Sequence, residues 1–341
     1  MRARFPWLCC CRWVRVELMI VAALFLATAC TARPAGLLRP NGIAVAPDGS
    51  LYVMDRGHYR VVHLAADGRF LGAFGRLGTG PDDIYAGWDV ALDSLGNIYI
   101  CNIVTREDGS GTAHDGVKVF TPDGHLVQEL DSQDYGYDDG VPRNIPYDLA
   151  IDDQDRIYVA YFGTNTLRIF NRQGDQVAEF FGQQVSEDGQ FSGLFGIDVH
   201  SQRNLIYVID HFSSRIHQFS LAVADTGALT LTQRLTFGSY GRGPGQLAYP
   251  QYLAVDEQSG RVYVADMGNQ RIQVFSEQGE YVAEFSPLAQ SDLAASGLKA
   301  WQVMGLALGK DGAIYAADAF NNAIWVFEPD GRLRVRLEVR P

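Results

Sequence analysis

Carboxylate and amide side chains stand just before three apolar segments of this sequence, at equivalent positions. Asn41, Asp89 and Asp148 lie one or two residues ahead of the apolar runs that begin at residues 43, 90 and 149. Hard divalent cations take oxygen ligands of this kind. If the fold brings the three positions together, these residues are candidate ligands for a divalent cation such as calcium.

Large side chains occupy the same positions ahead of the other five apolar runs, whereas Asn41-Gly42 precede the first. With the two carboxylates they make a predicted ligand-binding ring, which comprises Trp88, Asp89, Tyr147, Asp148, Phe195, Gln251, Tyr252 and Met304. Rigid aromatic rings with a few polar groups form a good binding surface. For any single member, packing between neighbouring structural units is the alternative role.

Motifs for other chemistries are missing from the sequence. There is no Gly-x-Ser-x-Gly nucleophile motif and no glycine-rich phosphate loop. No histidine stands at the positions that precede the apolar runs, which argues against a three-histidine zinc site there. We therefore assign no catalytic residue and expect no cofactor, with a divalent cation as the alternative.

A short pattern, an aliphatic residue followed by Tyr and a small apolar residue, recurs six times. Its tyrosines are Tyr52, Tyr99, Tyr158, Tyr207, Tyr263 and Tyr315, at spacings of 47, 59, 49, 56 and 52 residues. Asp stands three residues after Tyr in four copies, at Asp55, Asp210, Asp266 and Asp318. A catalytic acid does not need four copies, so we expect this Asp to bind turn amides or the Arg found five residues later in some copies.

Each Tyr segment follows one of the apolar runs, and turn residues such as Asp48-Gly49 and Asp311-Gly312 separate the two. Further turns lead to a third and a fourth strand. Because the first two strands are apolar nearly throughout, both faces of each sheet must be covered. Radial packing of such sheets predicts an all-β, six-bladed β-propeller with four antiparallel strands per blade. No spare strand precedes the first copy, so we expect closure without a strand-swapped blade.

The segments Phe237–Pro250 and Val262–Phe275 resemble NHL repeats, and the resemblance extends over residues 37–340. It implies a propeller in which ligands meet the ring at one mouth of the central channel, where the innermost strands begin. Enzymes of the gluconolactonase type have similar six-bladed rings and use carboxylates and Asn around a divalent ion. The resemblance thus also implies an enzymatic alternative at Asn41, Asp89 and Asp148.

The first 29 residues have the features of a secretory signal. Arginines precede the apolar run 18–27, which is shorter than the ~20 residues of a transmembrane helix. Small residues then lead to Cys30, and this end resembles a bacterial lipobox. We predict a signal peptide at 1–29, a lipidated Cys30, a linker at 30–36 and the propeller at 37–341. The protein would be an exported cell-envelope lipoprotein, at the outer membrane or its periplasmic face in a Gram-negative cell.

The formal net charge of −12 makes nucleic acid an unsuitable partner, because such binding depends on Lys and Arg. Contact with a membrane is then expected only through the lipid. After cleavage Cys101 would be the one thiol apart from Cys30, and its apolar surroundings predict a buried, inert side chain. We expect a monomer.

These observations favour binding over catalysis. The predicted function is that of a lipid-anchored extracytoplasmic scaffold, whose propeller mouth recognises a protein, peptide or glycan. The alternative is a divalent-metal-dependent hydrolase or lyase acting at the same mouth.

Overall fold

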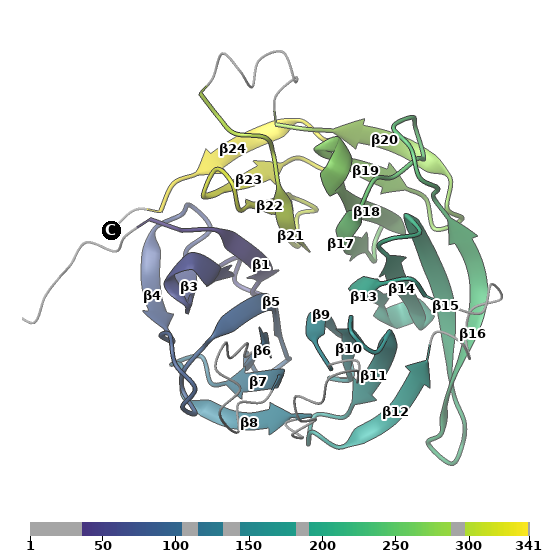
Figure 1. Cartoon of the computed structure of the whole chain (residues 1–341), viewed down its shortest axis with the longest axis horizontal. Helices are drawn as coiled ribbons and strands as arrows, with labels where there is room; N and C mark the ends of the chain where they lie inside the picture. Colours follow the sequence, from purple (N-terminus) through teal and green to yellow (C-terminus); the bar gives the residue numbers. More distant parts are fainter. Residues whose placement is uncertain (1–35, 104–114, 132–143, 182–190, 288–296, 340–341) are drawn as a thin grey trace, which may run out of the picture. The chain divides into compact units, whose positions relative to one another are not determined.

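Strands and short turns make up the described part of the chain in the computed structural model (Figure 1). The structure describes residues 36–103, 115–131, 144–181, 191–287 and 297–339. The predicted signal peptide and Cys30 lie outside the described residues, and so does most of the predicted linker. Within the described ranges, no helix is long and apolar enough to cross a membrane.

The first three repeats form three separate four-stranded antiparallel sheets. Blade one contains β1 (Pro40–Val45), β2 (Leu51–Asp55), β3 (Arg60–Leu64) and β4 (Phe70–Phe74). Blade two contains β5 (Ala86–Leu92), β6 (Ile98–Ile103), β7 (Gly116–Phe120) and β8 (Leu126–Leu130). Blade three contains β9 (Pro146–Ile151), β10 (Ile157–Tyr161), β11 (Thr166–Phe170) and β12 (Gln176–Phe181).

The last three repeats form three more sheets with the same strand order. Blade four contains β13 (Leu194–His200), β14 (Leu205–Asp210), β15 (Arg215–Val223) and β16 (Leu229–Phe237). Blade five contains β17 (Pro250–Asp256), β18 (Arg261–Asp266), β19 (Arg271–Phe275) and β20 (Tyr281–Phe285). Blade six contains β21 (Val303–Leu308), β22 (Ile314–Asp318), β23 (Ala323–Phe327) and β24 (Leu333–Leu337). The predicted six-bladed β-propeller is therefore confirmed.

The only helical segments of the described ranges are three single turns of 3₁₀ helix. They are η1 (Arg56–His58), η2 (Ser201–Arg203) and η3 (Met267–Asn269). η1 and η3 connect the second and third strands of blades one and five, at the end of the blade where the innermost strand begins, because Pro40 pairs with Asp55 and Pro250 with Asp266.

The first strand of every blade lines the axis, and the fourth strand lies at the rim (Figure 1). The second strands are buried almost completely, because both faces of each sheet pack against neighbouring blades. The fourth strands alternate between exposed and partly buried residues, as in β16, because only one of their faces meets protein. Apolar content in the sequence therefore decreases from the axis to the rim.

Blade one closes the ring against blade six, and within the described ranges no strand is shared between them, as predicted. Leu37, Leu51 and Val53 of the first repeat pack in one cluster with Ile324 and Leu337 of the last. We call this contact the seam.

One hydrogen bond of the seam is repeated at the join between blades three and four. The Arg39 N–H donates to Asn322 Oδ1 at 2.8 Å across the seam, and the Leu194 N–H donates to Asn165 Oδ1 at 3.1 Å between blades three and four. Both asparagines have positive φ, near +50°, a conformation that Asn tolerates better than most residues. An Asn at this turn therefore ties each of these joins.

The repeated Asp after the second strand has a structural role, as predicted. Asp266 is fully buried and accepts hydrogen bonds from the Ala248 N–H at 2.7 Å and from Arg271 Nε at 2.8 Å. Asp55 makes the same pair of contacts, with the Leu38 N–H and with Arg60 Nε. Asp210 accepts instead from the Ser192 backbone and hydroxyl. In each case the carboxylate holds the segment that leads into the innermost strand of its own blade.

Candidate functional site

A layer of aromatic side chains crosses the axis where the innermost strands begin. The ring centroids of Trp88 and Tyr147 are 4.8 Å apart, and those of Tyr147 and Phe195 are 4.1 Å apart. Tyr147, Phe195 and Tyr252 are each less than a tenth exposed, and Trp88 packs against them while remaining partly exposed. The structure thus brings the predicted aromatic positions together, but most of these rings contact one another.

Further aromatic rings extend this layer outward to the surface of the same face. His211 stacks on Phe195 at 4.1 Å, Tyr249 lies 5.6 Å from His211, and Tyr240 lies 6.2 Å from Tyr249. We call the continuous series the aromatic band: Trp88, Tyr147, Phe195, His211, Tyr249 and Tyr240. Tyr240 is 68% exposed and Tyr249 45% exposed, so the band reaches from the axis into solvent.

A basic hollow adjoins the central end of the aromatic band. The Arg56 guanidinium lies over the Trp88 ring, 4.0 Å from its centroid, in a cation–π contact. A hollow of about 300 Å³ lies beside it, lined by Arg39, Arg56, Tyr59 and Tyr85 among others. This face therefore combines aromatic rings with two arginines, although the chain as a whole is acidic.

Glycines at the mouth allow neighbouring innermost strands to approach closely. A Cβ on Gly42 would lie 2.3 Å from Asp89 Oδ1, and a Cβ on Gly305 would lie 2.5 Å from the Asn41 carbonyl oxygen. Gly42 lies in an irregularity of the β1–β2 pairing, between Pro40 and Ile43. Only glycine fits where one blade meets the next at this radius.

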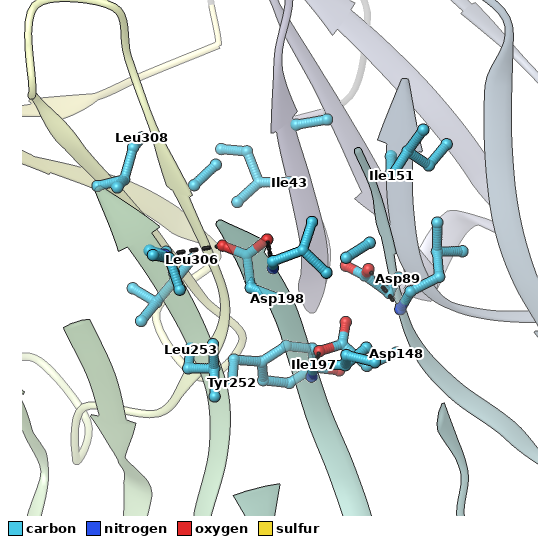
Figure 2. Close-up of a pocket in the computed structure, with 18 of the residues that line it drawn as sticks. Ile43, Asp89, Asp148, Ile151, Ile197, Asp198, Tyr252, Leu253, Leu306 and Leu308 are labelled. Atoms are coloured by element: carbon cyan, nitrogen blue, oxygen red, sulfur yellow. Dashed lines mark hydrogen bonds between the residues drawn. The ribbon is translucent and has the colours of Figure 1, made fainter. Parts of the chain in front are cut away.

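Below the aromatic layer, the innermost strands enclose a cavity of about 330 Å³ on the axis, shown in Figure 2. Most of the residues that line it are aliphatic, among them Ile43, Leu92, Leu253, Leu306 and Leu308, while polar groups make up more of the surface that faces the cavity. The innermost strands become more exposed toward their carboxyl ends, so the cavity opens on the face opposite the aromatic band. We call it the axial cavity.

Three aspartates on successive blades place their carboxyl groups in the axial cavity (Figure 2). Asp148 accepts a hydrogen bond from the Ile197 N–H at 2.8 Å, and Asp89 accepts a longer one, 3.4 Å, from the Leu149 N–H. Asp198 accepts from its neighbour Val199 and, at 2.7 Å, from Val255 in the next blade. Each carboxyl group is thus held by backbone amides.

Burial raises the pKa of all three carboxyl groups. Burial raises the pKa of Asp148 well above its ordinary value, and the adjacent Asp89 carboxyl raises it further. The pKa of Asp89 is also raised, mainly by burial. The pKa of Asp198 is raised to about 7 by burial, with a smaller contribution from Glu257, and the two backbone hydrogen bonds oppose the shift. Near neutral pH the axial cavity therefore holds protons that ordinary aspartates would have released.

Tyr252 also contributes to the axial cavity. Its side chain is 2% exposed, and its hydroxyl makes no hydrogen bond of ordinary geometry with described residues. In Figure 2 the Tyr252 ring lies between Leu253 and Asp148. A buried hydroxyl without a partner is costly, and this one lies in the wall of the cavity beside Tyr147, whose ring centroid is 5.9 Å from that of Tyr252.

The structure divides the predicted ring into two environments. Trp88, Tyr147, Phe195 and Met304 belong to the hydrophobic cluster of the aromatic layer, and neither they nor Gln251 line the cavity. The side chains of Asp89, Asp148 and Tyr252 line the axial cavity. Asn41 is 1% exposed and does not line the cavity, so the structure brings two of the three predicted metal ligands into it. Within the described ranges, no three His, Cys, Asp or Glu side chains lie together in a way that could hold a metal ion.

Sequence reasoning missed Asp198 as a site residue. Alanine occupies the corresponding strand position in the other five blades: Ala44, Ala91, Ala150, Ala254 and Ala307. A single charged residue among five alanines, in a strand that faces the axis, was the available signal.

Fold and site together define a six-bladed β-propeller that contains NHL repeats. The NHL repeat family matches residues 37–64 and 247–275, which include β1–β3 of blade one and β17–β19 of blade five. A curated relative, Protein lin-41 of Caenorhabditis elegans, is 46% identical over 50 residues. That match covers 15% of this chain and 4% of the relative's length.

Solved structures share the whole ring at low sequence identity. Virginiamycin B lyase from Staphylococcus aureus is similar with a TM-score of 0.56 and 14% identity, over 90% of this chain and 87% of that one. XC5397 from Xanthomonas campestris, described as a gluconolactonase, is similar with a TM-score of 0.60 and 15% identity, over 85% and 86% of the two chains. These similarities show the fold.

Proposed function

We propose that this protein is an extracytoplasmic, lipid-anchored scaffold that binds a protein, peptide or glycan on the face where the aromatic band lies. The observation that supports this proposal is the band itself. It is continuous from the axis to Tyr240 and has an arginine at its central end. Aromatic and Arg side chains supply most of the binding energy at many interfaces.

Exposed aromatic residues gather on the same face. The turn between second and third strands lies at the same end of a blade as the start of the first strand. Phe212 and Phe320 are in such turns and are 54% and 46% exposed, while Tyr240 and Tyr249 precede β17. Such exposed rings on one face are typical of an interaction surface.

The experiment compares three variants of the mature protein as bait in envelope extracts of the source organism. Trp88→Ala and Tyr249→Ala remove partly exposed rings of the band. Tyr281→Ala is the matched control, because Tyr281 is 37% exposed but begins β20 at the opposite end of its blade. We expect at least a tenfold loss of partner capture in the first two variants and none in the control. Equal capture by all three would reject the mouth as the binding face.

The lipid anchor is a separate part of the proposal and has its own test. Cys30→Ala should prevent incorporation of labelled palmitate and release the protein from the membrane fraction in a bacterial host. Retention of both label and membrane association in this variant would reject lipidation at Cys30.

A divalent-metal-dependent hydrolase or lyase is the second candidate function. It is favoured by the buried carboxyl pair of Asp89 and Asp148, which interact directly and line the axial cavity. Two carboxylates provide part of the oxygen shell that a hard cation prefers. Saturable calcium binding that is lost in Asp89→Asn would support this function, and calorimetry without binding would reject it.

A further inference from the structure

We propose that the axial cavity is a second binding site, separate from the aromatic face, and that it takes a small organic cation with an ammonium group on an aliphatic body. The reasons are the charge of the cavity, its shape and the unpaired hydroxyl inside it.

Four of the six polar side chains that line the axial cavity are acidic, and none of the residues that line it is basic. Asp89, Asp148 and Asp198 come from three neighbouring innermost strands, and Glu257 lies beyond the end of β17. Burying several carboxylates together without a cation is unfavourable, because each loses hydration and repels the others. A bound cation would offset both the lost hydration and the repulsion between the carboxylates.

The distribution of the carboxyl groups and the aliphatic wall match an ammonium ion better than a divalent metal. A metal such as calcium takes six to eight oxygen ligands around one point. Most of this lining is instead Val, Ile, Leu and Ala. A primary ammonium group has three N–H donors that can reach separate acceptors, and its hydrocarbon part would cover apolar wall.

The Tyr252 hydroxyl is an independent sign that the site takes a polar ligand. The Tyr252 side chain lines the axial cavity, and its hydroxyl is buried in the cavity wall, where it makes no hydrogen bond of ordinary geometry with described residues. As an acceptor it would take one N–H of an ammonium group, and the aspartates would take the others. The volume of about 330 Å³ lies within the range of small-molecule sites, which is ~300–1,000 Å³.

The test is isothermal titration calorimetry on the mature protein at pH 8, with four probes: hexylamine, hexanol, hexanoate and calcium chloride. Hexylamine and hexanol have the same hydrocarbon chain, so their difference measures the contribution of the charge. We expect saturable binding of hexylamine, at least tenfold weaker binding of hexanol and no binding of hexanoate. Equal affinity for hexylamine and hexanol would overturn the proposal. So would tighter binding of calcium that competes with hexylamine, which would favour the metal site instead.

Three variants locate the site. Asp198→Ala introduces the residue that the other five blades carry, and Tyr252→Phe removes only the unpaired hydroxyl. Both should weaken hexylamine binding, by at least tenfold and about threefold respectively. Asp67→Ala, in an exposed turn, is the control and should leave hexylamine binding unchanged. Unaltered binding in Asp198→Ala, with the fold verified by circular dichroism, would overturn the proposal. If Trp88→Ala loses partner capture while Asp198→Ala and Tyr252→Phe keep it, the aromatic face and the axial cavity are separate sites.

Discussion

Replacing Asp198 by Ala should make the stability of the protein less dependent on pH. In the folded protein burial raises the pKa of Asp198 to about 7, whereas an unfolded chain has the ordinary value of ~3.9. A raised pKa means that the folded state binds more protons than the unfolded state between these two values. Stability from this group is therefore fully present below the unfolded value and is lost as the pH rises toward 7.

The size of this effect follows from the shift in pKa. At 1.36 kcal/mol per pKa unit, the whole shift corresponds to roughly 4 kcal/mol, of which about 3 kcal/mol falls between pH 4.5 and 7.5. Asp198→Ala also loses two hydrogen bonds to backbone amides, at a cost that varies little with pH. The free energy of unfolding of the variant, relative to the natural protein, should hence rise by about 3 kcal/mol over this range.

Urea unfolding at several pH values between 4.5 and 7.5, followed by tryptophan fluorescence, measures this difference. The natural protein and the variant should have similar m-values, because the exposed area hardly changes. Asp67→Ala, in an exposed turn, is a suitable control and should show the same pH dependence as the natural protein. A constant difference between Asp198→Ala and the natural protein at all pH values would refute the argument.

Three further predictions concern the scaffold. Gly42→Ala should lower the free energy of unfolding by about 1–3 kcal/mol, because the added methyl group overpacks the contact between blades. Gly72→Ala, where a Cβ would meet nothing within 4 Å, should change the free energy of unfolding by less than about 1 kcal/mol. The midpoints of urea unfolding compare the two variants. Asp266→Ala should lower the free energy of unfolding by about 3–5 kcal/mol, because it leaves the buried Ala248 N–H and Arg271 Nε donors unpaired. Glu284→Gln, on the exposed side of Arg271, should lower it by less than about 1 kcal/mol. A similar loss of stability in both variants would contradict the role of the buried Asp. Cys101 is buried, and burial raises the pKa of its thiol, so Ellman's reagent should react with Cys101 only after unfolding. Rapid reaction of Cys101 in the folded protein would contradict the prediction of an inert thiol.

The fold could be predicted from the sequence because every blade repeats the same local information. Tyr in the second strand and turns that contain Gly recur in each unit, and Asp ends the second strand in four of them, so an error in one copy is corrected by the others. The structure then confirmed the buried Asp and the closure without a shared strand.

The site was harder to predict because it depends on how neighbouring blades are offset along the axis. Sequence position alone cannot tell whether Trp88 and Tyr147 face solvent or each other, and the 4.8 Å contact between their rings decides this. Asp89 lies directly after Trp88, yet its side chain reaches the axial cavity while Trp88 stays in the aromatic layer. Asp198 was overlooked because a repeat pattern directs attention to what the copies share, and its charge departs from that pattern.

The seam has a mechanical consequence for the ring. Blades one and six belong to separate sheets, and side chains such as Leu37 and Leu337, together with the Arg39–Asn322 hydrogen bond, join them. Every other pair of adjacent blades is also linked through the polypeptide itself. Tension applied between the two ends of the propeller will therefore separate the first and last blades while each sheet keeps its ladder of hydrogen bonds. The ring should open into a curved row of intact blades before any blade unravels.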